Sequence, residues 1–193
     1  MSEARTHFDV FELPPRYALD VAELERRYRE QSRQWHPDRF GRAPASERAQ
    51  VLQRATDLNE AYRVLKSDTR RAEYLLKLHG VDVTKESPDN KLPVDPAFLM
   101  EILELREELL EARHEKNTAK LRQLSARVAA EMTSLGGQVA AGFALLESTP
   151  QPSTLGALTQ ALLARRYFQR FADDIAAYEE AQTELAATQP TEL

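Results

Sequence analysis

The spacing of hydrophobic residues predicts that the first third of the chain begins with an amphipathic helix. Leu24, Tyr28 and Trp35 recur at helical spacing and fall on one face. A start signal of the form D-x-x-E opens this helix at Asp20, and we expect it to end near Gln34. The opposite face is polar, so the helix packs on one side only.

A second helix follows a polar loop over 36–44 and starts near Ser46. Its apolar positions are Val51, Ala55, Leu58, Tyr62 and Leu65. Two helices of similar length joined by a short loop are expected to pack antiparallel. A shorter helical stretch runs from Arg71 to Leu78, and Gly80 supplies a left-handed cap after it.

The composition changes after residue 80. Residues 81–94 include the segment Ser87-Pro88-Asp89-Asn90 and a further proline, which is typical of a linker. We therefore predict an N-terminal domain over 1–80 and a C-terminal domain over 95–193.

The C-terminal domain is predicted to hold three long helices. Asp95 and Pro96 supply the N-cap and first-turn proline of the first, Asn117 caps the second and Ser153 caps the third. The helices are expected to end near Lys116, Glu147 and Ala187. Because strand-forming residues are scarce, the fold class is all-α, with an antiparallel helical hairpin followed by a three-helix bundle.

The composition also narrows the possible chemistry. The 193-residue chain has no cysteine, which excludes disulfides, thiolate-held metal and a cysteine nucleophile. No apolar run approaches the roughly 20 residues that span a bilayer, and no apolar signal region opens the chain, so we expect a cytoplasmic protein with no membrane partner. The net charge of −5 argues against a nucleic-acid partner.

The charge is divided unevenly along the chain. Residues 1–77 hold 15 Lys/Arg against 13 Asp/Glu, whereas residues 78–193 hold 11 against 18. This asymmetry indicates two surfaces with different partners, although solvated helix faces produce similar imbalances.

A tripeptide, His36-Pro37-Asp38, lies at the tip of the predicted hairpin. An exposed tip offers neither a pocket nor oxyanion donors, so a docking role is favoured over general base catalysis. Proline limits the backbone freedom of this loop, and the carboxylate of Asp38 can bind a partner's arginine. A basic stripe on the preceding helix leads into the tip and consists of Arg26, Arg29 and Arg33.

Together with the segment N-E-A-Y-R-V-L at 59–65, these features make residues 7–78 similar to a DnaJ-type J-domain. The resemblance implies docking on a DnaK-type chaperone ATPase and stimulation of its ATP hydrolysis. In that family His36, Pro37 and Asp38 are the essential residues and the arginine stripe steers the contact. Phe40 and Tyr62 are expected to be core residues rather than contacts.

The helix that begins near Asp95 carries two apolar faces. One face is expected to be buried and consists of Phe98, Ile102, Leu105 and Leu109. The second sector alternates apolar and acidic residues: Leu99, Met100, Leu103, Glu104, Glu107, Leu110 and Glu111. This second sector has two interpretations: it is a docking surface, or it is a second packing face, as expected for a helix that lies between two others. Leu110 is assigned to the core.

The segments F-L-M-E at 98–101 and L-E-L-R-E-E-L at 103–109, with R-A-E-Y-L-L-K-L-H-G at 71–80, are similar to the HscB family, J-domain co-chaperones of iron–sulfur cluster assembly. The resemblance implies that the C-terminal domain binds an IscU-type scaffold protein. The implied contacts are Leu99, Met100, Leu103, Glu104, Glu107, Glu111 and Phe168, with Tyr167 and Phe171 as neighbouring aromatic alternatives to Phe168. No cofactor and no metal site are expected.

We therefore expect a co-chaperone rather than an enzyme, which recruits an HscA/DnaK-type chaperone at one end and an IscU-type scaffold at the other. Two alternatives stay open. The first is a general J-domain co-chaperone for a different or unfolded client. The second is a hydrolase that uses His36 and Asp38, which the lack of a pocket in the sequence pattern disfavours.

Overall fold

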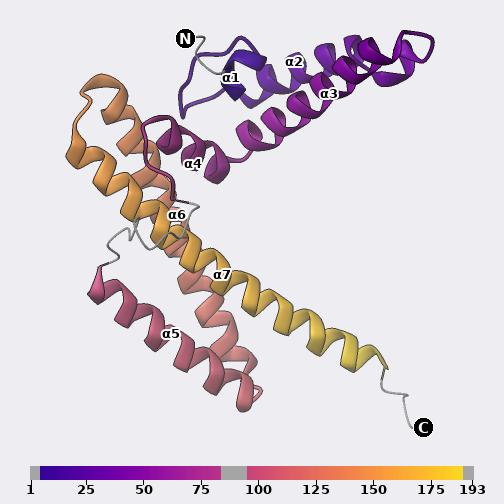
Figure 1. The fold of residues 1–193 in the computed structure, drawn as a ribbon. Helices are drawn as coiled ribbons and strands as arrows, with labels where there is room; N and C mark the ends of the chain where they lie inside the picture. The colour runs from indigo at the N-terminus through magenta and orange to yellow at the C-terminus, as the bar shows by residue number, and fades with distance from the viewer. Residues whose placement is uncertain (1–4, 84–94, 189–193) are drawn as a thin grey trace. The chain divides into compact units, whose positions relative to one another are not determined.

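The computed structural model describes residues 5–83 and 95–188, and these residues form helices and connecting segments without a strand (Figure 1). The predicted all-α fold is confirmed. Apart from the segment Glu147–Thr149, the described residues divide into two compact units, 5–83 and 95–188. Of the predicted linker, residues 84–94 lie outside the described residues, and the predicted domain limits stay predictions.

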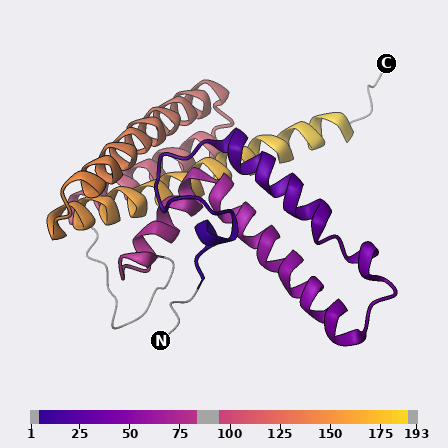
Figure 2. The ribbon, with the colours of Figure 1, turned by 90° about the horizontal axis from the view of Figure 1, so that it is seen from above.

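The first unit is built on an antiparallel hairpin of α2 (Val21–Gln34) and α3 (Ala45–Lys66), seen side by side in Figures 1 and 2. The side chain of Asp20 accepts hydrogen bonds from two backbone N–H groups of the first turn of α2, which confirms the predicted start. The predicted end at Gln34 is also confirmed.

Two contacts hold the hairpin together along its length. Tyr28 of α2 stacks on Tyr62 of α3 with ring centroids 4.0 Å apart. Near the open end of the hairpin, the Glu25 carboxylate pairs with the Lys66 ammonium at 3.0 Å. The buried apolar residues of the hairpin are Leu24, Val51, Leu58, Ala61, Val64 and Leu65.

Two shorter helices complete the first unit: α1 (His7–Val10) and α4 (Asp68–Leu78). The helix predicted from Arg71 begins three residues earlier, because the Ser67 side chain accepts a hydrogen bond from a backbone N–H and acts as its cap. Gly80 has φ +86°, which confirms the predicted left-handed residue after the helix.

Arg71 is a buried charge that joins three parts of the first unit. Its guanidinium donates to the backbone carbonyls of Tyr17 (2.8 Å) and Leu65 (2.5 Å) and to the carboxylate of Asp68 (2.6 Å). Only 4% of the residue is exposed. Arg71 therefore donates to backbone carbonyls of two separate segments of the first unit.

The second unit contains α5 (Pro96–His114), α6 (Thr118–Ser148) and α7 (Pro152–Thr188), which confirms the predicted three-helix bundle (Figure 1). The Asp95 side chain caps α5 by accepting from the backbone N–H of Ala97, as predicted. The expected cap at Ser153 is wrong, because α7 begins one residue earlier with a proline in the first turn.

Close packing of apolar side chains holds the bundle together. A Cβ added at Gly142 of α6 would lie 2.7 Å from Leu158 Cδ2 of α7, so glycine permits this approach of the two helices. Ile102, Leu105 and Leu109 of α5 are buried, as predicted. The bundle leaves the remaining faces of α5 to solvent, which positions the second candidate site.

Candidate functional site

The tip of the hairpin is a short 3-10 helix, η1 (Pro37–Phe40), preceded by His36 as its N-cap. The Asp38 backbone N–H donates to His36 Nδ1 at 3.3 Å, and Asp38 Oδ2 lies 3.6 Å from the same nitrogen. Proline at the first helical position fixes the backbone direction. The Asp38 side chain is 89% exposed, so the loop presents its carboxylate outward.

The side chains behind the tip are stacked. Trp35 lies parallel to Phe40, with ring centroids 6.2 Å apart, and the guanidinium of Arg54 covers the Trp35 ring at 4.2 Å. Arg39 donates to the carbonyl of Arg33 at 2.9 Å and ties the tip to the end of α2. Phe40 is half-buried and serves this stack, in agreement with its expected packing role.

The three arginines of the predicted stripe differ in how much of their charge is free. Arg26 pairs with Glu23 and with Glu30 at 2.7 Å each, and Arg29 lies 4.0 Å from a carboxylate oxygen of Glu25. Arg33 has no carboxylate within 4.0 Å in the part of the chain that the structure describes. The free positive charge of α2 is therefore concentrated at Arg33, next to the tip.

The pairing of Glu23 is strong enough to shift its titration. Hydrogen bonds from Arg26, and then from Arg27, lower the pKa of Glu23 to about 2. The same interactions raise the pKa of Arg26. Both groups are thus charged at neutral pH and largely neutralise each other.

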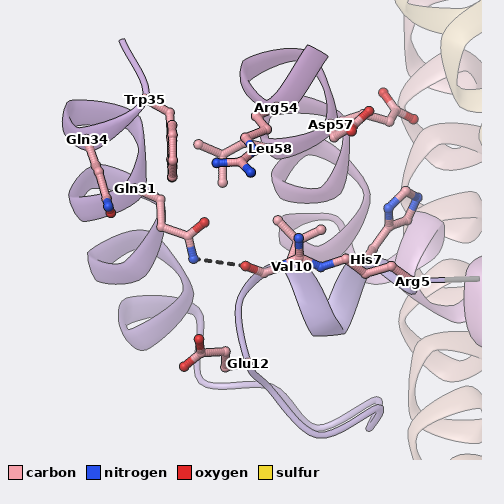
Figure 3. Close-up of a pocket in the computed structure, with 11 residues that line it drawn as sticks. Arg5, His7, Val10, Glu12, Gln31, Gln34, Trp35, Arg54, Asp57 and Leu58 are labelled. Carbon is pink, nitrogen blue, oxygen red and sulfur yellow. Dashed lines mark hydrogen bonds between the residues drawn. The ribbon is translucent and has the colours of Figure 1, made fainter. Parts of the chain in front are cut away.

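Two cavities flank the hairpin. The larger, of about 640 Å³, lies among α1, α2 and α3 and is lined by acidic, basic and amide side chains, including Arg54 and Asp57 (Figure 3). There, Gln31 donates to the Val10 carbonyl at 2.9 Å. The smaller, of about 360 Å³, lies beside His36 and Pro37 and includes the exposed Leu52.

Neither cavity places the side chains of His36 and Asp38 together in the arrangement that catalysis would need. Asp38 lines neither cavity, and Nδ1 of His36 accepts a hydrogen bond from its own loop. The geometry therefore favours docking over acid–base chemistry at the tip. No group of three or more His, Cys, Asp or Glu side chains among the described residues could hold a metal ion.

The second candidate site is the outer face of α5. Leu99, Met100 and Leu103 are 38%, 59% and 53% exposed, which favours the docking interpretation of this sector over a second packing face. The assignment of Leu110 to the core is wrong, because this side chain is 64% exposed. We call the exposed residues Leu99, Met100, Leu103, Glu104, Glu107, Leu110 and Glu111 the α5 strip.

The carboxylates of α5 fall into two groups. Glu101 pairs with Arg127 at 3.0 Å and Glu108 pairs with Lys120 at 2.7 Å, so both join α5 to α6. No ion pair within 4.0 Å is found among the described residues for the three acidic members of the strip: Glu104, Glu107 and Glu111. Glu111 is close enough to Lys120 to help raise the pKa of that ammonium, so the negative charge that is most available to a partner is that of Glu104 and Glu107.

The structure changes the assignment of the aromatic residue on α7. Phe168 is 2% exposed and packs edge-to-face on Phe98, with ring centroids 5.8 Å apart. It cannot contribute an exposed contact, so its expected place in the binding surface is corrected. Tyr167 is half-buried and also contacts Phe98, at 5.7 Å, so of these two neighbouring aromatic residues it is the one with exposed surface.

Comparison with known proteins matches both units. The model of the "DnaJ domain" matches residues 6–74, and that of the "HSCB C-terminal oligomerisation domain" matches residues 94–176. Chaperone HscB from Vibrio cholerae is 29% identical, with a TM-score of 0.75 over 92% of this chain and 99% of that one. Human co-chaperone protein HscB is 26% identical, with a TM-score of 0.77 over 93% of this chain and 84% of the human chain.

A relative in Burkholderia mallei, described as a co-chaperone protein HscB homolog, is 39% identical over 161 residues. The match covers 83% of this chain and 89% of the relative. The resemblance inferred from the tripeptide and from the F-L-M-E segment is thus confirmed. The chain belongs to the HscB family of J-domain co-chaperones, whose J-domain implies an Hsp70-type chaperone as partner.

Proposed function

We propose that this co-chaperone stimulates the ATPase of an HscA/DnaK-type chaperone through its hairpin tip and delivers to it an IscU-type iron–sulfur scaffold protein bound on the α5 strip. The observation that carries this proposal is the presence of two exposed patches with opposite character. The tip offers Asp38 and Arg33, whereas the strip offers apolar side chains with three carboxylates, and neither Arg33 nor these carboxylates form an ion pair within 4.0 Å among residues 5–83 and 95–188.

The tip acts through geometry. His36 caps the short helix and Pro37 restricts its first backbone angle, and the carboxylate of Asp38 is directed to solvent, where an arginine of the chaperone can bind it. Because the loop is already ordered, little conformational entropy is lost on docking. Arg33 steers the approach of an acidic chaperone surface.

The strip acts through apolar contact. Burial of an exposed leucine or methionine contributes about 1.5–3 kcal/mol, so Leu99, Met100 and Leu103 together can anchor a folded partner. The carboxylates beside them favour a partner with lysine or arginine at the rim and disfavour an acidic one. Tyr167 extends the same surface onto α7.

Carrying both patches on one chain raises the effective concentration of the scaffold at the chaperone. No catalytic group is required of the co-chaperone itself. The ATP hydrolysis belongs to the chaperone, and the scaffold is its client.

The proposal is tested by separating the two activities. Asp38→Ala is expected to abolish ATPase stimulation while scaffold binding, measured by calorimetric titration, stays unchanged. The double variant Leu99→Ala/Leu103→Ala is expected to lose scaffold binding by about a hundredfold or more while stimulation by the tip remains. Both variants change exposed side chains, so unfolding midpoints close to wild type serve as the control.

Loss of both activities in each folded variant would overturn the division of labour. The alternative client, an unfolded chain, is favoured by Met100, since methionine adapts to many partners. Comparable binding of unrelated denatured proteins, with no preference for the scaffold, would support that alternative instead.

A further inference from the structure

Leu110 is the most exposed of the large apolar side chains of α5, at 64%. At about 100° per residue it lies between Leu99 and Leu103 around the helix axis. At about 1.5 Å per residue, the row Leu99–Leu103–Leu110 extends for about 16 Å along α5. An isolated exposed leucine needs no explanation, but Leu99, Leu103 and Leu110 share one face of α5. We call this row the ridge. The exposed Arg106 lies between Leu103 and Leu110 on the same face, so the ridge is apolar at both ends and carries a cation in between.

The packing of the bundle explains why Leu110 stays outside. Its neighbours Leu109 and Ala112 are buried at 4% and 1% and fill the contact with the other helices. Beyond Ala112, Arg113 donates to the carbonyl of Asp174 on α7, and Tyr178 donates to the carbonyl of Arg113 at 3.2 Å. Leu109, Ala112 and Arg113 therefore make the contacts of this end of α5 with the bundle, and Leu110 lies outside them.

Carboxylates border this end of the ridge. Glu107 and Glu111 lie three residues before and one residue after Leu110 and are exposed, without an ion pair within 4.0 Å in the described parts of the chain. On the far side of α5, by contrast, Glu108 is paired with Lys120. A partner that covers Leu110 must therefore carry an apolar side chain with lysine or arginine beside it.

We propose that the scaffold-binding surface extends over Leu110, so that the IscU-type partner contacts the whole ridge rather than only its N-terminal end. This inference rests on the proposed function. A second copy of this chain is a poorer occupant, since a two-fold contact through this face would bring acidic side chains of the two copies together.

The test compares two equally conservative substitutions. Leu110→Ala is expected to weaken the binding of the scaffold protein at least tenfold in a calorimetric titration. Leu145→Ala removes a leucine of α6 that is 52% exposed and lies outside the strip, and it is expected to change the affinity by less than twofold. Thermal unfolding midpoints should match wild type for both.

The outcomes separate this inference from the proposed function. If Leu99→Ala/Leu103→Ala loses binding but Leu110→Ala binds like wild type, the extension to Leu110 is wrong and the proposed function stands. If neither variant changes the affinity for the scaffold protein, the proposed function itself fails. If sedimentation shows a dimer of the wild-type chain that Leu110→Glu dissociates, a second copy occupies the ridge and the inference is overturned.

Discussion

The hairpin tip and the α5 strip differ in what makes each of them a binding surface. At the tip, hydrogen bonds within the loop fix the position of one carboxylate, and stacked rings support it from behind. On the strip, a regular helix presents apolar side chains that its own bundle does not cover. Recognition by the tip therefore depends on charge and backbone geometry, whereas recognition by the strip depends on apolar area.

The interiors of the two units also differ in polarity. The first unit buries Arg71, which satisfies carbonyls from separate segments. In the second unit the buried side chains described on α5 and α6 are apolar, whereas α7 buries the uncharged Thr154 and Thr159 besides apolar residues, and α6 meets α7 closely at Gly142. The loss of a buried charged group should thus lower the stability of the first unit more than that of the second.

The largest effect is expected for Arg71→Leu. It leaves the carbonyls of Tyr17 and Leu65 without their buried donor, and we expect the first unit to lose about 2–4 kcal/mol of its free energy of unfolding. Amide hydrogen exchange, read separately for the two units, measures this loss. Equal protection of α2 and α3 in wild type and variant would show that the buried charge is dispensable.

A smaller effect distinguishes the arginines of α2. Arg33→Ala is expected to reduce ATPase stimulation about threefold at low salt and less at high salt, because the charge of Arg33, which has no carboxylate within 4.0 Å among the described residues, steers the encounter. Arg26→Ala, the matched control, removes a charge already paired with Glu23 and Glu30 and should have little effect. Stimulation is measured at several ionic strengths, and the reverse order of effects would contradict the assignment of the free charge.

The smallest expected effect is a pH dependence of the stability of the first unit, caused by His7. Burial lowers the pKa of His7, while Glu60 and Asp57 oppose the shift and Lys77 and Arg63 add to it. The unfolded state therefore binds the proton more readily, and the first unit loses stability as the pH falls through the unfolded value of about 6.5. NMR titration of His7 should give a midpoint below that value. A midpoint above it would mean that the nearby carboxylates dominate.

Much of the fold could be predicted because its signals are local. The cap at Asp20, the cap and proline at Asp95–Pro96 and the left-handed residue at Gly80 each act within one turn of helix. The buried face of α5 is likewise predicted by the helical spacing of its apolar residues. The early starts of α4 at Asp68 and of α7 at Pro152 show that helix ends are less well determined.

The errors arise where distant segments decide the outcome. A helix with leucines on both sides does not tell which side its neighbours cover, so Leu110 was assigned to the core although it is exposed. Phe168 and Tyr167 differ by one residue, or about 100° around α7, which decides between burial and exposure. The pairing of Arg26 with Glu23 and Glu30, by contrast, follows from their spacing and could have been predicted.

The claim that one chain must carry both surfaces is tested most directly by complementation in trans. The measurement is the steady-state ATPase rate of the chaperone with limiting scaffold protein, in the presence of wild type or of an equimolar mixture of Asp38→Ala and Leu99→Ala/Leu103→Ala. We predict a higher rate with wild type, because only the intact chain holds scaffold and chaperone together. An equal rate with the mixture would contradict the account.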